Sequence, residues 1–493
     1  MQYLYALAGL AGFVVVVLPR ARRNRKQELP PNHPPIVHIS PEDIYGDRRK
    51  AYEKALREHG PVIGVPRRGL LEFIVEDRFI PMIFTSSSFS FEEAATTSLN
   101  LRAFVSVFSS FFRDMDDVVQ GGVNPRLNAI LESTSPIFFR SVDKALKPGK
   151  DTRVEMFHFV SATVARVMMQ VIFGEPAKES TVNLIVKIAE DFSIMTGVYL
   201  PLSPFGRRFP TLWAAFTWIK ALCTTIPRFF FTFGPALWRH LRGRKWIKNQ
   251  DTAVPASVLE YLAFKHARED GTISRGGFMW ILSIVQTLVF ASVHQTASVA
   301  AWVMFEIAKR PEYLEKLRTE AFSLADPVTH EFEPSSINET LQKAVLLDAF
   351  IREVLRTKGD MLTVCRRTME DVQIGGCTVP KGHLVFPLAT LAHFNPASQP
   401  GPDPPEVFKP ERWMGANPRP AVMTGPSYLV FGFGKWACPG RVLAIADIKL
   451  MVWAIITKTT PRPEDEAYRL TELLHQASIP PLGGMILQPW EKK

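Results

Sequence analysis

The residues best placed to do chemistry in this chain surround Cys438, in the segment 431–440, which reads Phe-Gly-Phe-Gly-Lys-Trp-Ala-Cys-Pro-Gly. A cysteine thiolate is an anionic axial ligand that pushes electron density onto haem iron and favours O–O cleavage. Gly434 and Gly440 remove side chains where the backbone would turn and press close to a flat cofactor. We therefore interpret the segment as a haem-iron site. The alternative is that Cys438 is a small buried hydrophobic residue in a glycine-rich loop.

A helix is expected directly after this cysteine. Pro439 suits the first helical position, and residues 441–453 contain neither Gly nor Pro. Cys438 should therefore lie at a helix N-terminus. The partial positive charge at that terminus, with Lys435 and Arg441 close by, predicts a lowered thiol pKa.

The ten-residue pattern resembles the cysteine-ligand loop of the cytochrome P450 superfamily. The resemblance implies that Cys438 is the proximal iron ligand, that Phe431 packs beside its sulfur, and that the cofactor is haem b, iron protoporphyrin IX. This chain departs from many relatives at Trp436, where they carry Arg or His to hold a haem propionate. Indole donates one hydrogen bond and carries no charge, so propionate binding should depend more on other residues.

Glu353 and Arg356 are three residues apart in an amphipathic segment, 346–356, that we predict to be a helix. On a helix such residues share a face, and the ordinary interpretation is a solvated ion pair. The segment 408–413, Phe-Lys-Pro-Glu-Arg-Trp, lies between this helix and the cysteine loop. The family resemblance implies that Glu353, Arg356 and Arg412 form a buried charge network behind the haem.

Segment 365–376 is predicted to be a strand running into a turn. The resemblance implies that Arg366, at the start of this strand, contacts a haem propionate. The alternative is that Arg366 and Arg367 are a solvated pair. The resemblance also implies that residues 361–363 line the cavity above the haem, and the apolar character of that stretch favours a lipophilic ligand. These three residues are Met361, Leu362 and Thr363.

Residues 277–309 form a long, mostly apolar helical candidate. Length alone would permit a membrane span, but polar residues between 292 and 298 favour a buried helix with an oxygen-binding groove. The segment resembles the family's central helix, with His294 in place of an acid and Gln295 in place of an alcohol. We hypothesise that His294 and Gln295 hold a water chain that delivers protons. Thr296 is an alternative donor, turned about 100° from the expected direction.

The N-terminal residues 1–18 are almost uninterrupted apolar sequence, and a basic cluster follows them. We predict a membrane anchor over 1–18, a basic and proline-rich spacer over 19–35, and a catalytic domain over 36–493. The positive-inside rule then places the domain on the cytosolic side of the endoplasmic reticulum membrane as a single-pass protein. A cleaved secretory peptide and interfacial insertion are the alternatives.

Composition agrees with a cytosolic domain. The 493 residues include only four cysteines, which argues against a disulfide framework. The net charge of +10 is partly due to the basic cluster after the anchor, which would meet anionic membrane lipid, so no nucleic-acid partner is needed. Segment 205–246 alternates aromatic and basic residues; it is either a membrane-facing lid over the substrate entrance, as the resemblance implies, or packed core.

The resemblance covers the chain after the spacer. It implies a mainly α fold with a minor β component and a long central helix over the haem. The implied reaction is monooxygenation of a lipophilic small molecule, such as a terpenoid or related secondary metabolite, with O2 and electrons from NADPH–cytochrome P450 reductase. A His in the acid position is similar to fungal members of natural-product pathways. A haem-thiolate isomerase or dehydratase, and a non-catalytic membrane haem-binding protein, are the alternatives.

Overall fold

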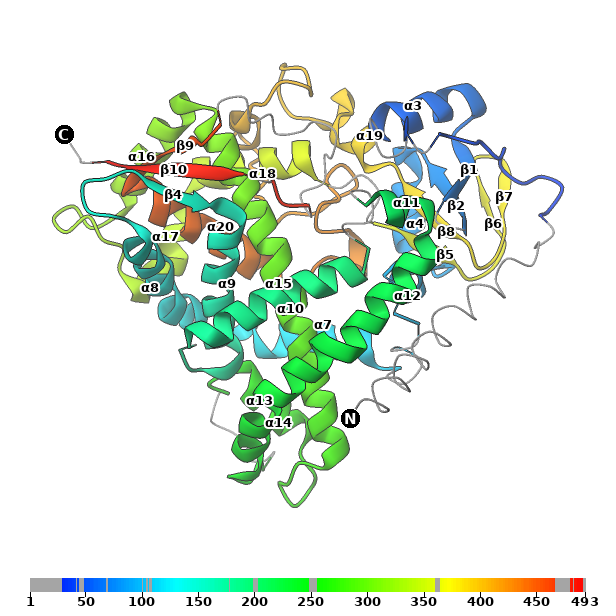
Figure 1. Ribbon diagram of the computed structural model, residues 1–493. Coiled ribbons are helices and arrows are strands. Elements are labelled where there is room, and N and C mark those ends of the chain that lie inside the picture. The colour runs from blue at the N-terminus through cyan, green and yellow to red at the C-terminus, as the bar shows by residue number, and fades with distance from the viewer. Residues whose placement is uncertain are drawn as a thin grey trace.

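The computed structural model describes residues 29–490, apart from positions 41, 44–47, 68–69, 100, 103–104, 106–108, 177, 198–202, 248–254, 360–363, 466–478 and 482. The predicted anchor, 1–18, and the basic part of the spacer lie outside the described residues. The fold is mainly helical with a minor sheet component, as expected (Figure 1).

The α-helices are α3 Arg48–His59, α4 Ile80–Thr85, α5 Phe91–Ser98, α7 Phe111–Gly122, α8 Leu127–Ala145, α9 Met156–Phe173, α10 Glu179–Met195, α11 Pro204–Arg208, α12 Pro210–Lys220, α13 Ile226–Arg242, α14 Val258–His266, α15 Arg275–Ala308, α16 Pro311–Leu324, α17 Ile337–Lys343, α18 Val345–Lys358, α19 Ala389–His393 and α20 Arg441–Ile456. A π-helical turn, Ala221–Thr225, joins α12 to α13.

The strands are β1 Val62–Arg67, β2 Leu70–Val75, β3 Phe89–Ser90, β4 Thr152–Glu155, β5 Arg366–Thr368, β6 Val372–Ile374, β7 Cys377–Val379, β8 Leu384–Pro387, β9 Thr459–Pro463 and β10 Gly484–Pro489. They form a five-stranded sheet in the order β1-β2-β8-β5-β3, a three-stranded sheet β4-β10-β9 and the hairpin β6-β7. The first two sheets lie on opposite sides of the molecule (Figure 1).

Helix α15 runs through the middle of the molecule (Figure 1) and matches the helix expected over 277–309. It begins where the Ser274 hydroxyl accepts a hydrogen bond from the Gly277 amide, 3.0 Å away. It ends shortly before Pro311, which cannot continue the helix. Helices α9, α10, α18 and α20 pack around it. Among the described residues α15 and α9 are long and apolar enough to cross a membrane, but both contribute to the core.

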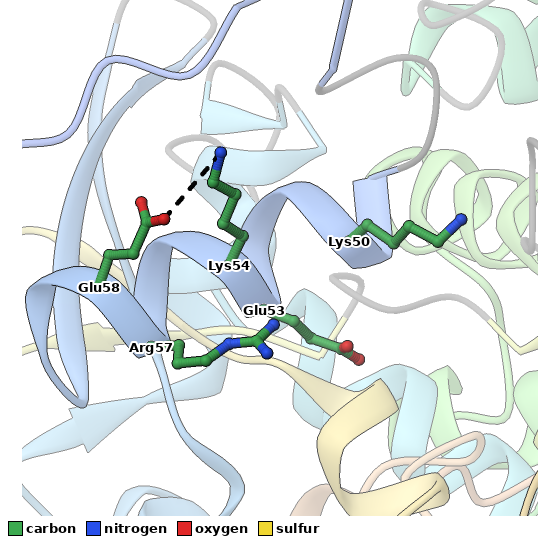
Figure 2. A pocket seen from close by; sticks show the side chains of 5 residues that line it. All are labelled: Lys50, Glu53, Lys54, Arg57 and Glu58. Carbon is green, nitrogen blue, oxygen red and sulfur yellow. Dashed lines mark ion pairs between the residues drawn. The ribbon is translucent and has the colours of Figure 1, made fainter.

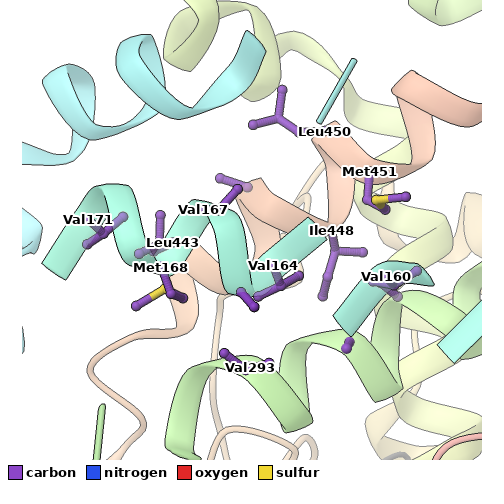
Figure 3. Packing of buried hydrophobic residues seen from close by; sticks show 14 of the residues in the cluster. Val160, Val164, Val167, Met168, Val171, Val293, Leu443, Ile448, Leu450 and Met451 are labelled. Atoms are coloured by element: carbon purple, nitrogen blue, oxygen red, sulfur yellow. The ribbon is translucent and has the colours of Figure 1, made fainter. Parts of the chain in front are cut away.

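The main hydrophobic core joins α9, α15 and α20. Val164 and Val167 of α9 face Ile448 of α20, and Val293 of α15 lies beneath them (Figure 3). Most of these side chains are β-branched or thioether residues that are fully buried. Burial of a side chain of this size stabilises the fold by about 1.5–3 kcal/mol. This packing fixes α20, and hence the loop before it, against the central helix.

The end of the predicted spacer is already attached to the folded domain. The side chain of Asn32 donates to the Gly376 carbonyl at 2.7 Å, and its own carbonyl accepts from the Thr378 amide. Ile36 forms a parallel β-bridge with Gly64 of β1. Asn32 and Ile36 therefore attach the end of the predicted spacer to the folded domain.

Candidate haem-thiolate site

The loop that carries Cys438 is closed by backbone hydrogen bonds. The Cys438 amide donates to the Phe431 carbonyl at 2.7 Å, and the Gly432 amide donates to the Leu429 carbonyl at 2.8 Å. Phe431 packs against the main core, which ties one end of the loop to the helical body. At the other end, Arg441 Nη1 donates to the Cys438 carbonyl at 2.7 Å. The Cys438 side chain is exposed.

Two glycines in this loop have backbone angles that other residues avoid. Gly432 and Gly434 have φ values of 73° and 71°. A Cβ on Gly434 would also lie 3.3 Å from the Phe84 carbonyl. Gly440 has no such constraint, because its φ is −84° and an added Cβ would meet no protein atom within 4 Å. Gly432 is therefore a second glycine that the loop conformation requires, and the sequence argument did not single it out.

Helix α20 begins at Arg441, so the expectation that Pro439 takes its first position is wrong. Gly440 is the N-cap, and the first helical hydrogen bond runs from the Ala444 amide to the Gly440 carbonyl. Pro439 and Gly440 form a turn that ends the cysteine loop. Cys438 still lies at the helix N-terminus, and the amides of Gly440 and Arg441 hydrogen-bond its thiol.

The predicted lowering of the thiol pKa is also wrong for the protein alone. Burial raises the pKa of Cys438, and it outweighs the two backbone amides and the charge of Arg441, which lower it. Although the sulfur has an exposed face, protein atoms surround it closely enough to disfavour the bare anion. A metal cation bound to the sulfur supplies the missing stabilisation of a thiolate.

Glu353, Arg356 and Arg412 lie together in the interior. Arg356 donates from Nε and Nη2 to the two carboxylate oxygens of Glu353, each at 2.8 Å. Arg412 Nε lies 3.4 Å from Glu353 Oε1. Glu353 is 0% exposed. It also accepts hydrogen bonds from the Lys409 amide and from Trp413 Nε1, each at 2.9 Å.

Trp413 was not predicted as a member of this charge network, although the sequence holds it directly after Arg412. Its indole N–H donates to Glu353 Oε2, the same oxygen that accepts from Arg356 Nε, and so adds a further hydrogen bond to the buried carboxylate. Arg412 in turn donates to the Val407 carbonyl at 2.8 Å, so the network fixes the loop from 403 to 413 against α18. The solvated ion pair considered for Glu353 and Arg356 is excluded by their burial.

Arg366 is 3% exposed, at the start of β5. Its Nη1 donates to the Cys365 carbonyl at 3.0 Å, and its guanidinium lies 4.0 Å from the Phe84 ring centre. Among the described residues no carboxylate forms an ion pair with it. Burial lowers the pKa of Arg366 to about 10. A buried cation of this kind requires an anionic partner, and the solvated pair considered from the sequence does not describe it.

Trp436 packs on a phenyl ring that also contacts Arg366. Its ring stacks on Phe91, with centroids 5.1 Å apart and planes at 26°. The Arg366 guanidinium lies 5.3 Å from the centroid of the same Phe91 ring. Phe91 was not predicted from the sequence, because nothing near it in the chain marks it as part of the site. Trp436 and Arg366 are thus joined through one phenyl ring.

The three predicted residues of the central helix point in different directions. Ala291, Gln295 and Val299 are four residues apart and form the least buried stripe in the middle of α15, which we call the open stripe. Gln295 is half-buried in it. His294 is 2% exposed and contacts Phe157 of α9 edge-on, with ring centroids 5.4 Å apart. Thr296 is buried on another side of the helix.

His294 therefore does not share the open stripe with Gln295, and the structure does not bring the two expected members of the water chain together. Burial lowers the pKa of His294 to about 4, so the ring is neutral near pH 7. The remaining predicted cavity residues, Met361, Leu362 and Thr363, lie outside the described residues.

A surface depression on α3 is unrelated to this site. Charged side chains of a single helix line it, and Lys54 and Glu58 form an ion pair there at 4.0 Å (Figure 2). Their high exposure makes this a solvated helix face.

Comparison with known proteins decides the family. The family model described as Cytochrome P450 matches residues 123–486, which include the central helix, the charge network and the cysteine loop. This chain belongs to the cytochrome P450 family.

Curated relatives of this P450 include fungal proteins. It is 31% identical over 229 residues to cytochrome P450 monooxygenase 3 of Gibberella fujikuroi, covering 40% of this chain and 44% of that protein. It is 27% identical over 359 residues to cytochrome P450 monooxygenase AN1598 of Emericella nidulans, covering 69% and 63%. The matches thus span less than two thirds of the length of these relatives.

Solved P450 structures share the fold over nearly the whole chain. The cytochrome P450 CYP109Q5 from Chondromyces apiculatus superimposes with a TM-score of 0.61 at 17% identity, covering 93% of this chain and 99% of that one. A retinoic-acid-bound cyanobacterial CYP120A1 gives 0.65 at 18% identity, covering 94% and 100%.

The residues of this P450 fit a haem. Cys438 offers an exposed sulfur at a helix N-terminus, and the amides of Gly440 and Arg441 point at it. Arg366 offers a buried cation with no carboxylate paired to it in the described part of the chain. A porphyrin with one iron and acidic side groups satisfies both requirements.

Segment 205–246 of this P450 is divided between the two interpretations. Phe229, Phe233 and Trp246 are buried in the main core. By contrast, the outer face of α11 and α12 is exposed, and Phe216 there is 62% exposed. The large exposed apolar residues on α11, on α12 and at the junction between them are Phe205, Phe209, Leu212 and Phe216, and Phe231 of α13 is exposed as well.

Proposed function

We propose that this P450 is a haem-dependent monooxygenase that oxidises a lipophilic small molecule. The observation that carries the proposal is the exposed Cys438 thiol, held by its own amide to Phe431 and by Arg441 at the start of α20. Bound haem b would supply reductive activation of O2 and transfer of one oxygen atom to an unactivated C–H bond.

In this proposal the chain holds the cofactor at two points. The Cys438 sulfur binds the iron as a thiolate, with the amides of Gly440 and Arg441 sharing its negative charge. Arg366 pairs with a propionate, and the ring of Phe91 keeps the guanidinium in place. The buried network of Glu353, Arg356 and Arg412 holds the loop around residue 410 behind the haem.

Proton delivery is assigned to the open stripe of α15. The Gln295 carboxamide orders water through hydrogen bonds but does not titrate near pH 7, so it holds a proton donor in place. Ala291 leaves room beside it, because its side chain is only a methyl group. His294 is removed from this assignment, because it contacts Phe157 of α9 and remains neutral.

The substrate is proposed to be a terpenoid or a related secondary metabolite, and NADPH–cytochrome P450 reductase is proposed as the electron donor. Fungal monooxygenases among the relatives fit a secondary-metabolite substrate, and their names specify no compound class. The test is coexpression with the reductase and metabolite profiling by mass spectrometry. Products that require both NADPH and O2 support a monooxygenase. Turnover without either would indicate the isomerase or dehydratase, for which the missing alcohol at Gln295 is the motivating observation.

Attachment to the endoplasmic reticulum membrane is proposed for two segments, 1–18 and the outer face of α11 and α12. Leu212 and Phe216 lie on one side of α12 at helical spacing, Phe209 directly before the helix is exposed too, and so are Arg207 and Arg208 beside it. The full chain with Phe209→Ser and Phe216→Ser should release more readily from vesicles containing anionic lipid than the wild type does. Equal retention would leave 1–18 as the sole proposed attachment.

A further inference from the structure

His393, the last residue of α19, occupies a buried position between the charge network and the cysteine loop. It is 1% exposed. Its Nε2 accepts a hydrogen bond from the Leu429 amide at 3.0 Å, across 36 residues of sequence. Its carbonyl accepts from Arg356 Nη1 at 3.1 Å. One residue thus contacts both the helix that carries the charge network and the segment that leads into the loop.

The ring of His393 is neutral and has a defined tautomer. Burial, followed by the charges of Arg356 and Arg352, lowers the pKa of His393 to about 3. Because Nε2 accepts from Leu429, the ring proton must be on Nδ1. The Arg356 backbone also hydrogen-bonds the ring, which gives that proton an acceptor. Both sides of the ring are therefore used, one toward α18 and one toward Leu429.

Leu429 begins the chain of contacts that ends at the sulfur. Its carbonyl accepts from the Gly432 amide at 2.8 Å, which shapes the first turn of the loop. Phe431, two residues after Leu429, accepts the hydrogen bond of the Cys438 amide. A shift of the Leu429 backbone therefore moves the acceptor that orients Cys438.

We propose that His393 is a positioning residue for the iron ligand: through its hydrogen bond to Leu429 it couples the buried charge network of α18 to the geometry of the Cys438 loop. This inference rests on the proposed haem ligation by Cys438. His393 touches neither the sulfur nor the cofactor site and acts through the loop backbone. Sequence patterns did not mark it, because both partners are distant in the chain.

The test compares His393→Gln, His393→Asn and His393→Leu in the haem-loaded full chain. The Gln amide oxygen reaches the position of Nε2, whereas the Asn amide is too short. In His393→Leu and His393→Asn, hydrogen exchange at the Leu429 amide should be roughly ten-fold faster. The iron–sulfur stretching frequency in resonance Raman spectra should shift in the same two variants. His393→Gln should restore both values toward wild type.

Thr390→Val is the matched control. Thr390 is buried on the same helix, one turn before His393, and its hydroxyl has no hydrogen-bond partner in the described structure. This variant should change neither the exchange at Leu429 nor the iron–sulfur frequency.

Each outcome decides the question. If His393→Leu does not fold, the difference between the Gln and Asn variants remains as the test. Equal behaviour of these two variants, or wild-type values in all three, overturns the proposal for His393 while leaving the haem-thiolate assignment intact. A wild-type protein that binds haem without sulfur ligation would instead overturn the proposed function.

Discussion

The Glu353 carboxylate is fully buried, and the polar groups that contact it compensate its negative charge. Two guanidinium groups, an indole and a backbone amide surround its two oxygens. Such a network adds little stability over an apolar substitute, but removing one member leaves an uncompensated buried charge. Substitution of a side chain that pairs with Glu353 should therefore lower the stability of the protein strongly.

Glu353→Gln should destabilise the protein by about 3–5 kcal/mol, because it leaves Arg356 and Arg412 without a counter-charge. We expect the variant to accumulate without bound haem. Urea unfolding and the haem-to-protein ratio measure the two effects. Glu406→Gln, at an exposed position nearby, should match the wild type in both. Normal haem content in Glu353→Gln would contradict the proposed role of the network.

A second prediction at the residue scale concerns Arg366 and Trp436. Arg366→Met should accelerate haem transfer to apomyoglobin by about ten-fold or more, because a charge-assisted hydrogen bond to a propionate is lost. Trp436→Arg should slow the transfer, since it adds the cation that many relatives have at this position. Phe112→Leu is the control. The Phe112 ring contacts Phe91, but it is not one of the rings over the Arg366 guanidinium. Unchanged transfer in Arg366→Met would exclude the propionate contact.

At the scale of single elements, α15 places residues that are adjacent in sequence in different surroundings. Gln295 and His294 are adjacent in sequence, yet one lies in the open stripe and the other packs on α9. A helical step of about 100° is enough to separate a residue of the open stripe from one that belongs to the core.

Substitutions at these two positions should therefore have separate effects. Gln295→Ala should lower the fraction of NADPH consumption that yields oxygenated product, because ordered water is lost from the open stripe. His294→Asn should lower the melting temperature and leave that fraction unchanged. Product yield per NADPH and thermal unfolding distinguish the two. A loss of coupling in His294→Asn would restore the proton relay first expected for it.

The elements also show where sequence was informative. The cysteine loop, the Glu353–Arg356 pair and α15 are local patterns, and each was predictable because its residues are close in sequence. The start of α20 was misplaced, because a proline in a turn and a proline at a first helical position have the same local sequence. His393, Phe91 and Trp413 were missed, because their roles depend on partners brought together only by the fold.

Across the whole molecule, buried titratable groups set the response to acid. His294 and His393 have folded pKa values of about 4 and about 3, below the unfolded value near 6.5. Stability from these residues is complete above pH 6.5 and is lost as the pH falls toward 4, because only the unfolded chain takes up their protons. Asp447 acts in the opposite sense, since burial raises its pKa well above the usual value.

The net expectation is a loss of stability between pH 6.5 and pH 4, because the two histidines and carboxylates with a lowered pKa, such as Asp191, act against Asp447 and Glu320, whose pKa burial raises. The slope is up to about 1.4 kcal/mol per pH unit for each proton. Asp447→Asn should steepen this loss, and His393→Gln should flatten it. Urea unfolding across the pH range measures both slopes. A steeper profile in His393→Gln would contradict the assignment of a buried neutral ring.

The most direct test of the whole account is the absorption spectrum of the reduced, carbon monoxide-bound full chain. Haem ligation by Cys438 predicts the red-shifted Soret band of a sulfur-ligated haem in the wild type and its loss in Cys438→Ser, with overall helix content retained. A purified, folded wild-type chain that binds no haem, or whose carbonyl adduct lacks the red-shifted band, would contradict it.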